Sequence, residues 1–288
     1  SNVTNNSITL TVEAESENTI TNYYFAKNGE EYVSSASNTY TFTGLEDATE
    51  YTLKVYAVDN EGYQSAIYSF SISTEDFTFA DYLTNNIYTG VDGDNGLYYH
   101  DGVGSYTNAS QEAGDYSYRY AGANPNNYVC FGSDAETCPE DNLYRIIGVF
   151  GDQVKLIKYT NIGAYPWSGD GSNNNNTWSE SKLNTNILNE SYLNGLENKW
   201  QNLIAESSWQ VGGNTYQNIQ DVSIRNTYQN EIASPAMNIT YNAKVGLMYV
   251  SDYGYAASPD NWGTSLVNYN NDTNRNNNWL YTNIGAWT

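Results

Sequence analysis

The sequence has little positive charge, few cysteines and no long apolar run, and each shortage excludes a class of protein. Lysine and arginine number 11 against 33 aspartates and glutamates, which gives a net charge of −22. Because this field repels phosphate backbones and anionic lipid, we expect no nucleic-acid partner and no polybasic membrane contact. No apolar run approaches the roughly 18 residues of a membrane-spanning helix. No signal peptide is visible, so any membrane anchor is expected outside this stretch.

The polar character comes mainly from uncharged side chains. Charged residues make up only 15% of the chain, which therefore does not read as an acidic disordered tail. Tyrosine (29 residues) and threonine favour strands, whereas asparagine and glycine favour turns. At 288 residues the chain is long enough for two domains. These features predict a mainly β protein with a small α+β part.

Short strands separated by turns fill residues 1–75. "SITLTVEA" (7–14) alternates apolar and polar residues, as a half-buried strand does, and Asn28-Gly29 is a hairpin turn signal. Further on, alternate residues from Tyr51 to Ala57 share one face of a strand, and the chain returns over 66–73. This spacing predicts an Ig-like β-sandwich.

The same stretch resembles a fibronectin type III domain. The residues that carry the resemblance are Gly44-Leu45, Tyr51, the Leu53-Val55-Ala57 strand, and Gly62 with Ser65. It implies that Tyr51 is the corner tyrosine, with its hydroxyl bonded to the backbone near Leu45. The usual early-strand tryptophan is missing, and the first strand would have to fit into the six residues before Ser7. We therefore expect the chain to begin inside the domain. The family implies a spacer or interaction module.

Residues 76–115 are interpreted as a linker and approach segment. They place Asp92 and Asp94 at alternate positions of a glycine-bent loop, and carboxylate oxygens are what calcium prefers. Position 12 counted from Asp92 is Val103 instead of glutamate, so the EF-hand pattern is incomplete. Calcium is the one metal hypothesis, and an ordinary Asp/Gly turn is the alternative.

The chain shows no catalytic constellation. His100 is the only histidine, and no G-x-S-x-G elbow supplies it with a nucleophile. A zinc site needs several histidines or cysteines. We predict that the protein is not an enzyme, although the 33 carboxylates leave acid–base chemistry as an open alternative.

The two cysteines, Cys130 and Cys138, are read either as a metal or redox pair or as a staple across a loop. The spacing matches neither a C-x-x-C redox motif nor a zinc knuckle, and no second pair exists. Tying a loop of about nine residues stabilises by roughly 2.6 kcal/mol in the chain-entropy model. We predict a disulfide, which implies an oxidising, extracytoplasmic setting.

The remaining residues predict a hairpin, two short helices and one buried strand. The hairpin strands are expected at 144–150 and 154–159, with a third strand at 128–131. Thr177 and Glu180 form a capping-box pattern, and Asn194-Gly195 separates the two helices. "AKVGLMYVSDYGYAAS" is read as the buried strand.

This order of elements resembles a bacterial surface domain of unassigned function, similar to the fold of the formylglycine-generating enzyme (sulfatase-modifying factor) and the C-type lectins. The motifs are "NNYVCFGSD", "CPEDNLYRIIGVF", "VGLMYVSDYGYAAS" and "NRNNNWLY", within 116–288. Such modules resemble those of gut Firmicutes surface proteins, some with prepilin-like N-termini. The resemblance implies that the C-terminal strands are missing after Thr288. Neither the copper-binding cysteines of the oxidases nor the calcium triplets of the lectins are present, so no cofactor is carried over.

In the C-type-lectin-like fold the late loops make the ligand surface. The candidate ligand-binding residues are Tyr253, Tyr255, Trp262, Arg275 and Asn276. Amides hydrogen-bond to sugar hydroxyls and aromatic faces stack on sugar rings, whereas core packing is the alternative for each aromatic residue. We expect an extracellular, adhesin-like binding module on the bacterial cell surface, with a glycan or a host protein as partner. The alternative is a pilin-like or stalk subunit that packs against other copies.

Overall fold

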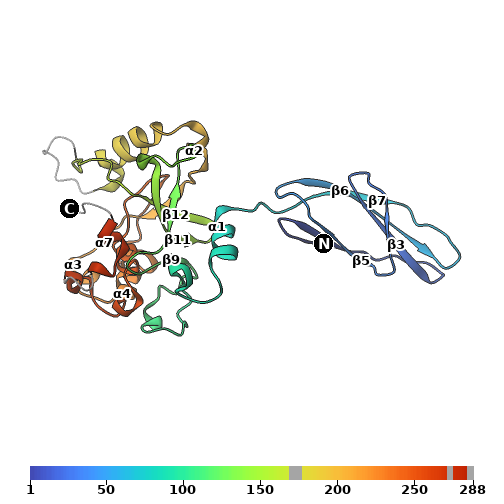
Figure 1. Ribbon diagram of the computed structural model, residues 1–288, viewed down its shortest axis with the longest axis horizontal. Helices are drawn as coiled ribbons and strands as arrows, with labels where there is room; N and C mark the ends of the chain where they lie inside the picture. Colours follow the sequence, from blue (N-terminus) through green and yellow to red (C-terminus); the bar gives the residue numbers. More distant parts are fainter. Residues whose placement is uncertain (169–176, 271–274, 284–288) are drawn as a thin grey trace. The chain divides into compact units, whose positions relative to one another are not determined.

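The computed structural model describes residues 1–168, 177–270 and 275–283, and the chain divides into two compact units, Ser1–Phe79 and Ala80–Thr288 (Figure 1). The content is mainly β, with short helices, as predicted. Over the described residues, no helix combines the length and the apolar character needed to cross a membrane.

The first unit is a β-sandwich of two antiparallel sheets. One sheet has the order β1 (Asn2–Val3), β2 (Ser7–Thr11), β5 (Thr39–Thr43), and the other has the order β4 (Val33–Ser35), β3 (Ile20–Lys27), β6 (Glu50–Asp59), β7 (Tyr68–Ser73). The first strand does fit into the residues before Ser7. The predicted alternation along β6 is confirmed, because Leu53 and Val55 are buried while Thr52 is exposed.

The corner tyrosine is also confirmed. The backbone N–H of Glu46 donates a hydrogen bond of 2.9 Å to the Tyr51 hydroxyl, one residue beyond Leu45. The ring of Tyr51 is buried in the same cluster as Phe25 and Leu53. One side chain thus closes the turn before β6 and fills the core beneath it.

The second unit is built on a five-stranded antiparallel sheet with β11 (Leu143–Phe150) at its centre (Figure 1). β12 (Gln153–Lys158) pairs along one edge of β11, while β10 (Tyr128–Cys130) and β9 (Tyr118–Tyr120) share the other edge. β8 (Leu97–Tyr99) then pairs with β9. Gly148 lies where β9 approaches closest, since a Cβ there would stand 2.2 Å from the carbonyl oxygen of Tyr118.

Residues 80–115 belong to the second unit, which corrects their interpretation as a linker. They include β8 and four helical segments: α1 (Phe79–Tyr82), η1 (Leu83–Ile87), η2 (Asp94–Gly96) and η3 (Ala109–Gln111). Leu83 and Leu97 are buried in one core cluster with Ile146 and Trp279. The segment therefore supplies a strand and part of the core, although its Gly/Asn-rich composition resembles that of a connector.

Short helices and one strand pair complete the second unit. The two expected helices are present, as η6 (Leu183–Tyr192) and α2 (Asn198–Leu203), with Gly195 between them. The Ser181 hydroxyl accepts the backbone N–H of Asn184 at 3.1 Å, in the turn that enters η6. The other segments are η4 (Glu140–Asn142), η5 (Trp178–Glu180), β13 (Ser207–Gln210), α3 (Tyr216–Ile219), α4 (Ile224–Tyr228), η7 (Gln229–Ala233), β14 (Thr240–Ala243), η8 (Pro259–Asn261), η9 (Leu266–Asn270) and α7 (Trp279–Asn283).

The buried strand expected at "AKVGLMYVSDYGYAAS" is wrong, because its second half forms the helix α5 (Val250–Tyr255). The carboxylate of Glu231 accepts the backbone N–H groups of Val250 and Ser251, each at 2.9 Å. The carboxylate of Asp252 accepts the backbone N–H of Tyr249 at 3.1 Å. Three N–H groups at the helix start are thereby satisfied, which decides for a helix where the apolar pattern alone favours a strand.

The predicted disulfide between Cys130 and Cys138 is confirmed, with the two Cα atoms 5.7 Å apart. It closes the loop that connects β10 to η4 and then to β11. Both cysteines of the chain are used in this bond.

His100 is a core residue. It is fully buried, and its Nδ1 accepts the backbone N–H of Ala113 at 3.2 Å. Its ring lies 4.8 Å from that of Tyr255 and 4.9 Å from that of Trp262, and its Nε2 has no hydrogen-bond partner among the described residues. Burial, with the nearby charge of Arg119, holds the pKa of His100 well below its usual value. The side chain is therefore neutral in the folded protein.

We predict that Tyr51→Phe lowers the free energy of unfolding of the first unit by about 1–2 kcal/mol, because the Glu46 N–H loses its acceptor. Hydrogen exchange of peptides from residues 1–79 measures the effect in the full chain. Tyr40→Phe is the control, because the Tyr40 ring also packs in this unit but its hydroxyl has no hydrogen bond within the described residues. Equal protection in the two variants would contradict a corner role for Tyr51.

We predict that His100 makes the second unit less stable as the pH falls from 7.5 to 5.5. The unfolded chain binds a proton near pH 6.5 but the folded chain does not, so wild type loses up to about 1.4 kcal/mol per pH unit relative to His100→Asn. Glu112 and Glu231, whose pKa values burial raises, act in the opposite direction in both proteins. Urea unfolding followed by tryptophan fluorescence reports this unit, since all seven tryptophans lie beyond residue 80. Identical pH slopes in the two proteins would refute the prediction.

Candidate ligand-binding site

Trp262, the central residue of the predicted late-loop site, is fully buried. Its ring packs against those of Tyr98 at 5.6 Å and Tyr106 at 5.7 Å, and its Nε1 donates to the carbonyl of Ala257 at 3.0 Å. A side chain with no exposed surface cannot stack on a ligand. The structure therefore assigns Trp262 to the core, and its proposed role in ligand binding is corrected.

The other four predicted residues are divided between core and surface. Tyr255 is also buried, and its hydroxyl donates to the carbonyl of Gln111 at 2.9 Å. Tyr253 is half-buried, and burial raises its pKa. Arg275 lies 5.4 Å from the ring of Tyr281, and Asn276 is exposed. The five residues thus do not form one surface.

The two aspartates of the calcium hypothesis bind different partners. Asp92 Oδ1 accepts the backbone N–H of Tyr99 at 2.7 Å and the hydroxyl of Tyr88 at 3.1 Å. Asp94 Oδ2 accepts the hydroxyl of Thr89 at 2.7 Å. In the described part of the chain, no three or more histidine, cysteine or acidic side chains are arranged to hold a metal ion. These bonds fit the Asp/Gly turn that was the alternative.

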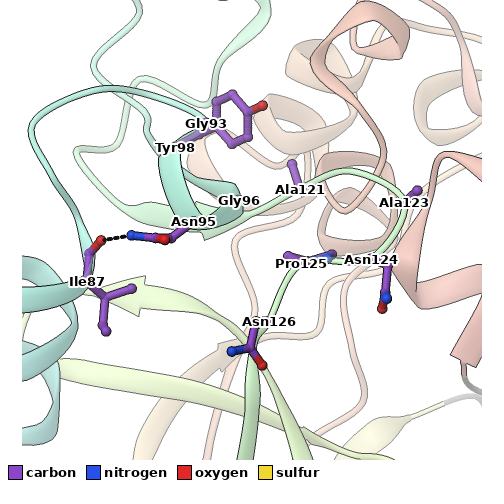
Figure 2. Close-up of a pocket in the computed structure, with 10 residues that line it drawn as sticks. All are labelled: Ile87, Gly93, Asn95, Gly96, Tyr98, Ala121, Ala123, Asn124, Pro125 and Asn126. Atoms are coloured by element: carbon purple, nitrogen blue, oxygen red, sulfur yellow. Dashed lines mark hydrogen bonds between the residues drawn. The ribbon is translucent and has the colours of Figure 1, made fainter.

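One pocket, of about 460 Å³, lies beside β8 (Figure 2). Its wall consists of Ile87, Gly93, Asn95, Gly96, Tyr98, Ala121, Ala123, Asn124, Pro125 and Asn126. Figure 2 shows the amide of Asn95 turned to the backbone of Ile87, whose carbonyl accepts its Nδ2 at 2.8 Å. Among these lining residues there is no acid, base or thiol. The described lining of this pocket therefore offers amide groups and the phenol of Tyr98.

A larger pocket, of about 550 Å³, gathers three tryptophans and two tyrosines, and we call it the tryptophan pocket. Its aromatic members are Trp167, Trp178, Trp209, Tyr216 and Tyr249, and its other lining residues include Gln210, Asn214, Ile219, Gln220, Glu231, Leu247 and Met248. This site could not be predicted from the sequence, because its lining residues lie up to 83 positions apart, from Trp167 to Val250, and no motif joins them.

Two of the aromatic side chains that line the tryptophan pocket are more than one third exposed to solvent, and we describe them as its rim. Trp167 is 37% exposed and Tyr216 is 48% exposed. The ring of Trp167 packs against that of the buried Trp178, with ring centroids 5.4 Å apart. Trp209 has a structural role, because its Nε1 donates to the carbonyl of Ala243 at 2.9 Å and the backbone of Gly246 lies against its ring. A ligand would therefore meet Trp167 and Tyr216 first.

Polar groups of the pocket lie next to its aromatic wall. The backbone N–H of Gln210 donates to the Tyr249 hydroxyl at 2.7 Å, and burial raises the pKa of Tyr249 to about 12. The side-chain Nε2 of Gln210 donates to Asn238 at 2.9 Å, while its Oε1 is buried and has no partner in the part of the chain that the structure describes. Gln210 is therefore a lining residue with one unsatisfied acceptor.

Among the described residues that line the tryptophan pocket, Glu231 is the one with an acidic or basic side chain. Burial raises its pKa, and the charge of Asp252 acts in the same direction. Both of its oxygens hold the start of α5 through Val250 and Ser251. The described lining of the pocket thus combines aromatic faces, amide groups and one carboxylate.

Comparison with known proteins gives a family for the first unit. Residues 1–74 match the model of the fibronectin type III domain. A fibronectin(III)-like module of CbhA from Clostridium thermocellum is 21% identical over 26% of this chain and 83% of that chain, with a TM-score of 0.21. A search of curated proteins found no match.

Two whole enzymes also show a likeness to part of the chain. The family 28 exopolygalacturonase of Yersinia enterocolitica is 16% identical over 26% of this chain and 19% of its own, with a TM-score of 0.25. The chitinase ChiA74 of Bacillus thuringiensis is 18% identical over 52% of this chain and 22% of its own, with a TM-score of 0.23. The chain thus spans about a fifth of the length of each enzyme. The family match, the sheet order and the corner tyrosine agree that residues 1–74 form a fibronectin type III domain.

Proposed function

We propose that this chain is an extracellular, non-enzymatic binding module of a bacterial surface protein, and that its second unit recognises a glycan through the tryptophan pocket. The observation that carries the proposal is the gathering of three tryptophans and two tyrosines around one cavity, with Trp167 and Tyr216 exposed at its rim. Aromatic faces stack on the apolar face of a sugar ring, and amides bond to its hydroxyls. The fibronectin type III domain then acts as a spacer or a second binding module.

The size and polarity of the pocket favour a glycan over a host protein as ligand. A volume of about 550 Å³ lies in the range that encloses a small ligand, roughly 300–1,000 Å³. Gln210 and Asn214 provide amide groups in its wall. A protein partner would instead need a broad, flatter patch. An adhesin-like role follows if the glycan belongs to a host surface.

Two further parts of the proposal come from other features. The disulfide between Cys130 and Cys138 supports an oxidising location outside the cytoplasm. We also propose a C-type-lectin-like fold for the second unit, which its antiparallel sheet and short helices suit. In that fold the late loops offer a second surface, with Tyr253, Arg275 and Asn276 as its members.

A second candidate function is a pilin-like or stalk subunit. The observation that favours it is the exposure of large apolar side chains on the first unit, where Tyr63 is 71%, Tyr68 is 66% and Ile67 is 52% exposed. Neighbouring copies could pack on such side chains. This candidate predicts self-association in solution instead of glycan binding.

We predict that Trp167→Ala and Tyr216→Ala each weaken glycan binding about fivefold or more, since each removes about 1 kcal/mol of ring stacking. Both side chains are partly exposed, so the melting temperature should change little. A glycan array finds the ligand, and titration calorimetry of the full chain measures its affinity.

Tyr281→Ala is the matched control, because Tyr281 is 45% exposed but lies on α7, outside the tryptophan pocket. If only this control abolished binding, the site would lie on the late loops near Arg275. A blank array from a folded, disulfide-bonded sample that self-associates would favour the stalk subunit.

A further inference from the structure

Next to the tryptophan pocket lies a group of ion pairs, and one carboxylate near it, that of Glu231, takes part in none of them within the described residues. Arg119 pairs with Asp115 at 2.7 Å and with Asp252 at 3.2 Å, and Lys155 pairs with Asp252 at 2.5 Å. Two cations thus meet two carboxylates. Glu231 adds a third carboxylate, and it has no ion-pair partner within the described residues.

The ionised form of the Glu231 carboxylate, which lines the pocket, is disfavoured by its surroundings. Burial disfavours the ionised carboxylate of Glu231, and the neighbouring Asp252 adds repulsion, so that its pKa is raised. Each oxygen accepts one backbone N–H, which leaves a further lone pair on each. A cation placed in the pocket would offset this cost, because a buried charge is stabilised chiefly by a partner of opposite sign.

The walls of the pocket also suit a cation. The faces of tryptophan and tyrosine attract ammonium groups, and Trp167 and Tyr216 are accessible at the rim. The net charge of −22 attracts cationic ligands over longer distances.

Lys155 does not prevent a cation from entering. Its ammonium group lies 4.4 Å from the ring centroid of Tyr249, but it is paired with Asp252 and does not line the pocket. Because Asp252 offsets the charge of Lys155, the uncompensated charge at the wall is that of Glu231.

We infer that the tryptophan pocket takes a saccharide that carries a free, protonated amino group, and that Glu231 pairs with this ammonium. The inference rests on the proposed glycan-binding function and names the chemical class of the sugar. An N-acetylated or neutral sugar has no charge to pair with Glu231, so the pocket would bind it less tightly.

The test compares two ligands with the same sugar backbone and linkage, one with free amines and one with neutral acetamides in their place. The β-1,4-linked glucosamine tetramer and its fully N-acetylated counterpart are titrated against the full chain at about pH 6, where most of the amines are protonated. We expect the amine form to bind at least about tenfold more tightly. Added salt should narrow this difference, because it screens the ion pair but not the ring stacking.

Two variants with the same change in charge locate the effect. Glu231→Gln should remove the preference for the amine form, whereas Glu136→Gln, in the exposed part of the stapled loop, should keep it. If Glu231→Gln unfolds the start of α5, Glu231→Asp replaces it. This variant keeps the net charge but draws the carboxylate back from the pocket wall, so it should narrow the preference for the amine form, whereas attraction by the overall charge would leave the preference unchanged. Trp167→Ala then serves as a second variant, and it should weaken binding of both tetramers.

Each outcome separates the two proposals. Equal affinity for the two tetramers, or a preference for the acetylated form, would overturn the inference and leave the glycan-binding function standing. No binding of any glycan would overturn both. A preference that survives in folded Glu231→Gln would show attraction by the overall charge and would overturn the role of Glu231.

Discussion

The second unit depends on one buried charge, the guanidinium of Arg119 on β9. The side chain is 1% exposed, so burial works against its charge, yet Asp115 and Asp252 raise its pKa. Its carbon atom Cζ also lies 4.6 Å from the ring centroid of Phe150 and 5.0 Å from that of Tyr255. Removing one partner of such a pair leaves an uncompensated buried charge and typically costs about 3–5 kcal/mol. This interaction joins two segments that lie 133 positions apart.

The position of Asp252 determines the geometry of the tryptophan pocket. Arg119 and Lys155 fix its carboxylate, and the carboxylate accepts the N–H of Tyr249 at the start of α5. Glu231 satisfies the next two N–H groups of the same helix. Tyr249 and Glu231 are thereby held in the wall of the pocket. The wall of the proposed binding pocket therefore depends on the start of α5, which in turn depends on the buried ion pairs of Asp252.

The sequence predicted those features that depend on neighbouring residues. The strands of the first unit and the disulfide follow from local alternation, turn signals or short spacing. The corner role of Tyr51 follows from the resemblance to fibronectin type III domains. The start of α5 could not be predicted in this way, because the cap comes from Glu231, some 20 positions earlier, and the ion partners of Asp252 lie further still. The tryptophan pocket could not be predicted for the same reason, since tertiary contacts alone bring its residues together. The prediction that Trp262 binds a ligand was wrong because the sequence does not distinguish an aromatic residue in the core from one on the surface.

Three tryptophans of the second unit are fixed by hydrogen bonds from their indole N–H groups. Trp262, Trp279 and Trp209 each donate to a backbone carbonyl, at 3.0, 2.8 and 2.9 Å. A buried indole needs such a partner, so these three are fixed by the fold. Trp167 and Trp178 have no such bond to the described residues, although both line the tryptophan pocket. The lining of the tryptophan pocket thus includes these two tryptophans together with Gln210 and Glu231. Aromatic rings beside polar groups are what the proposed sugar ligand requires, because its ring stacks on aromatic faces and its hydroxyls form hydrogen bonds.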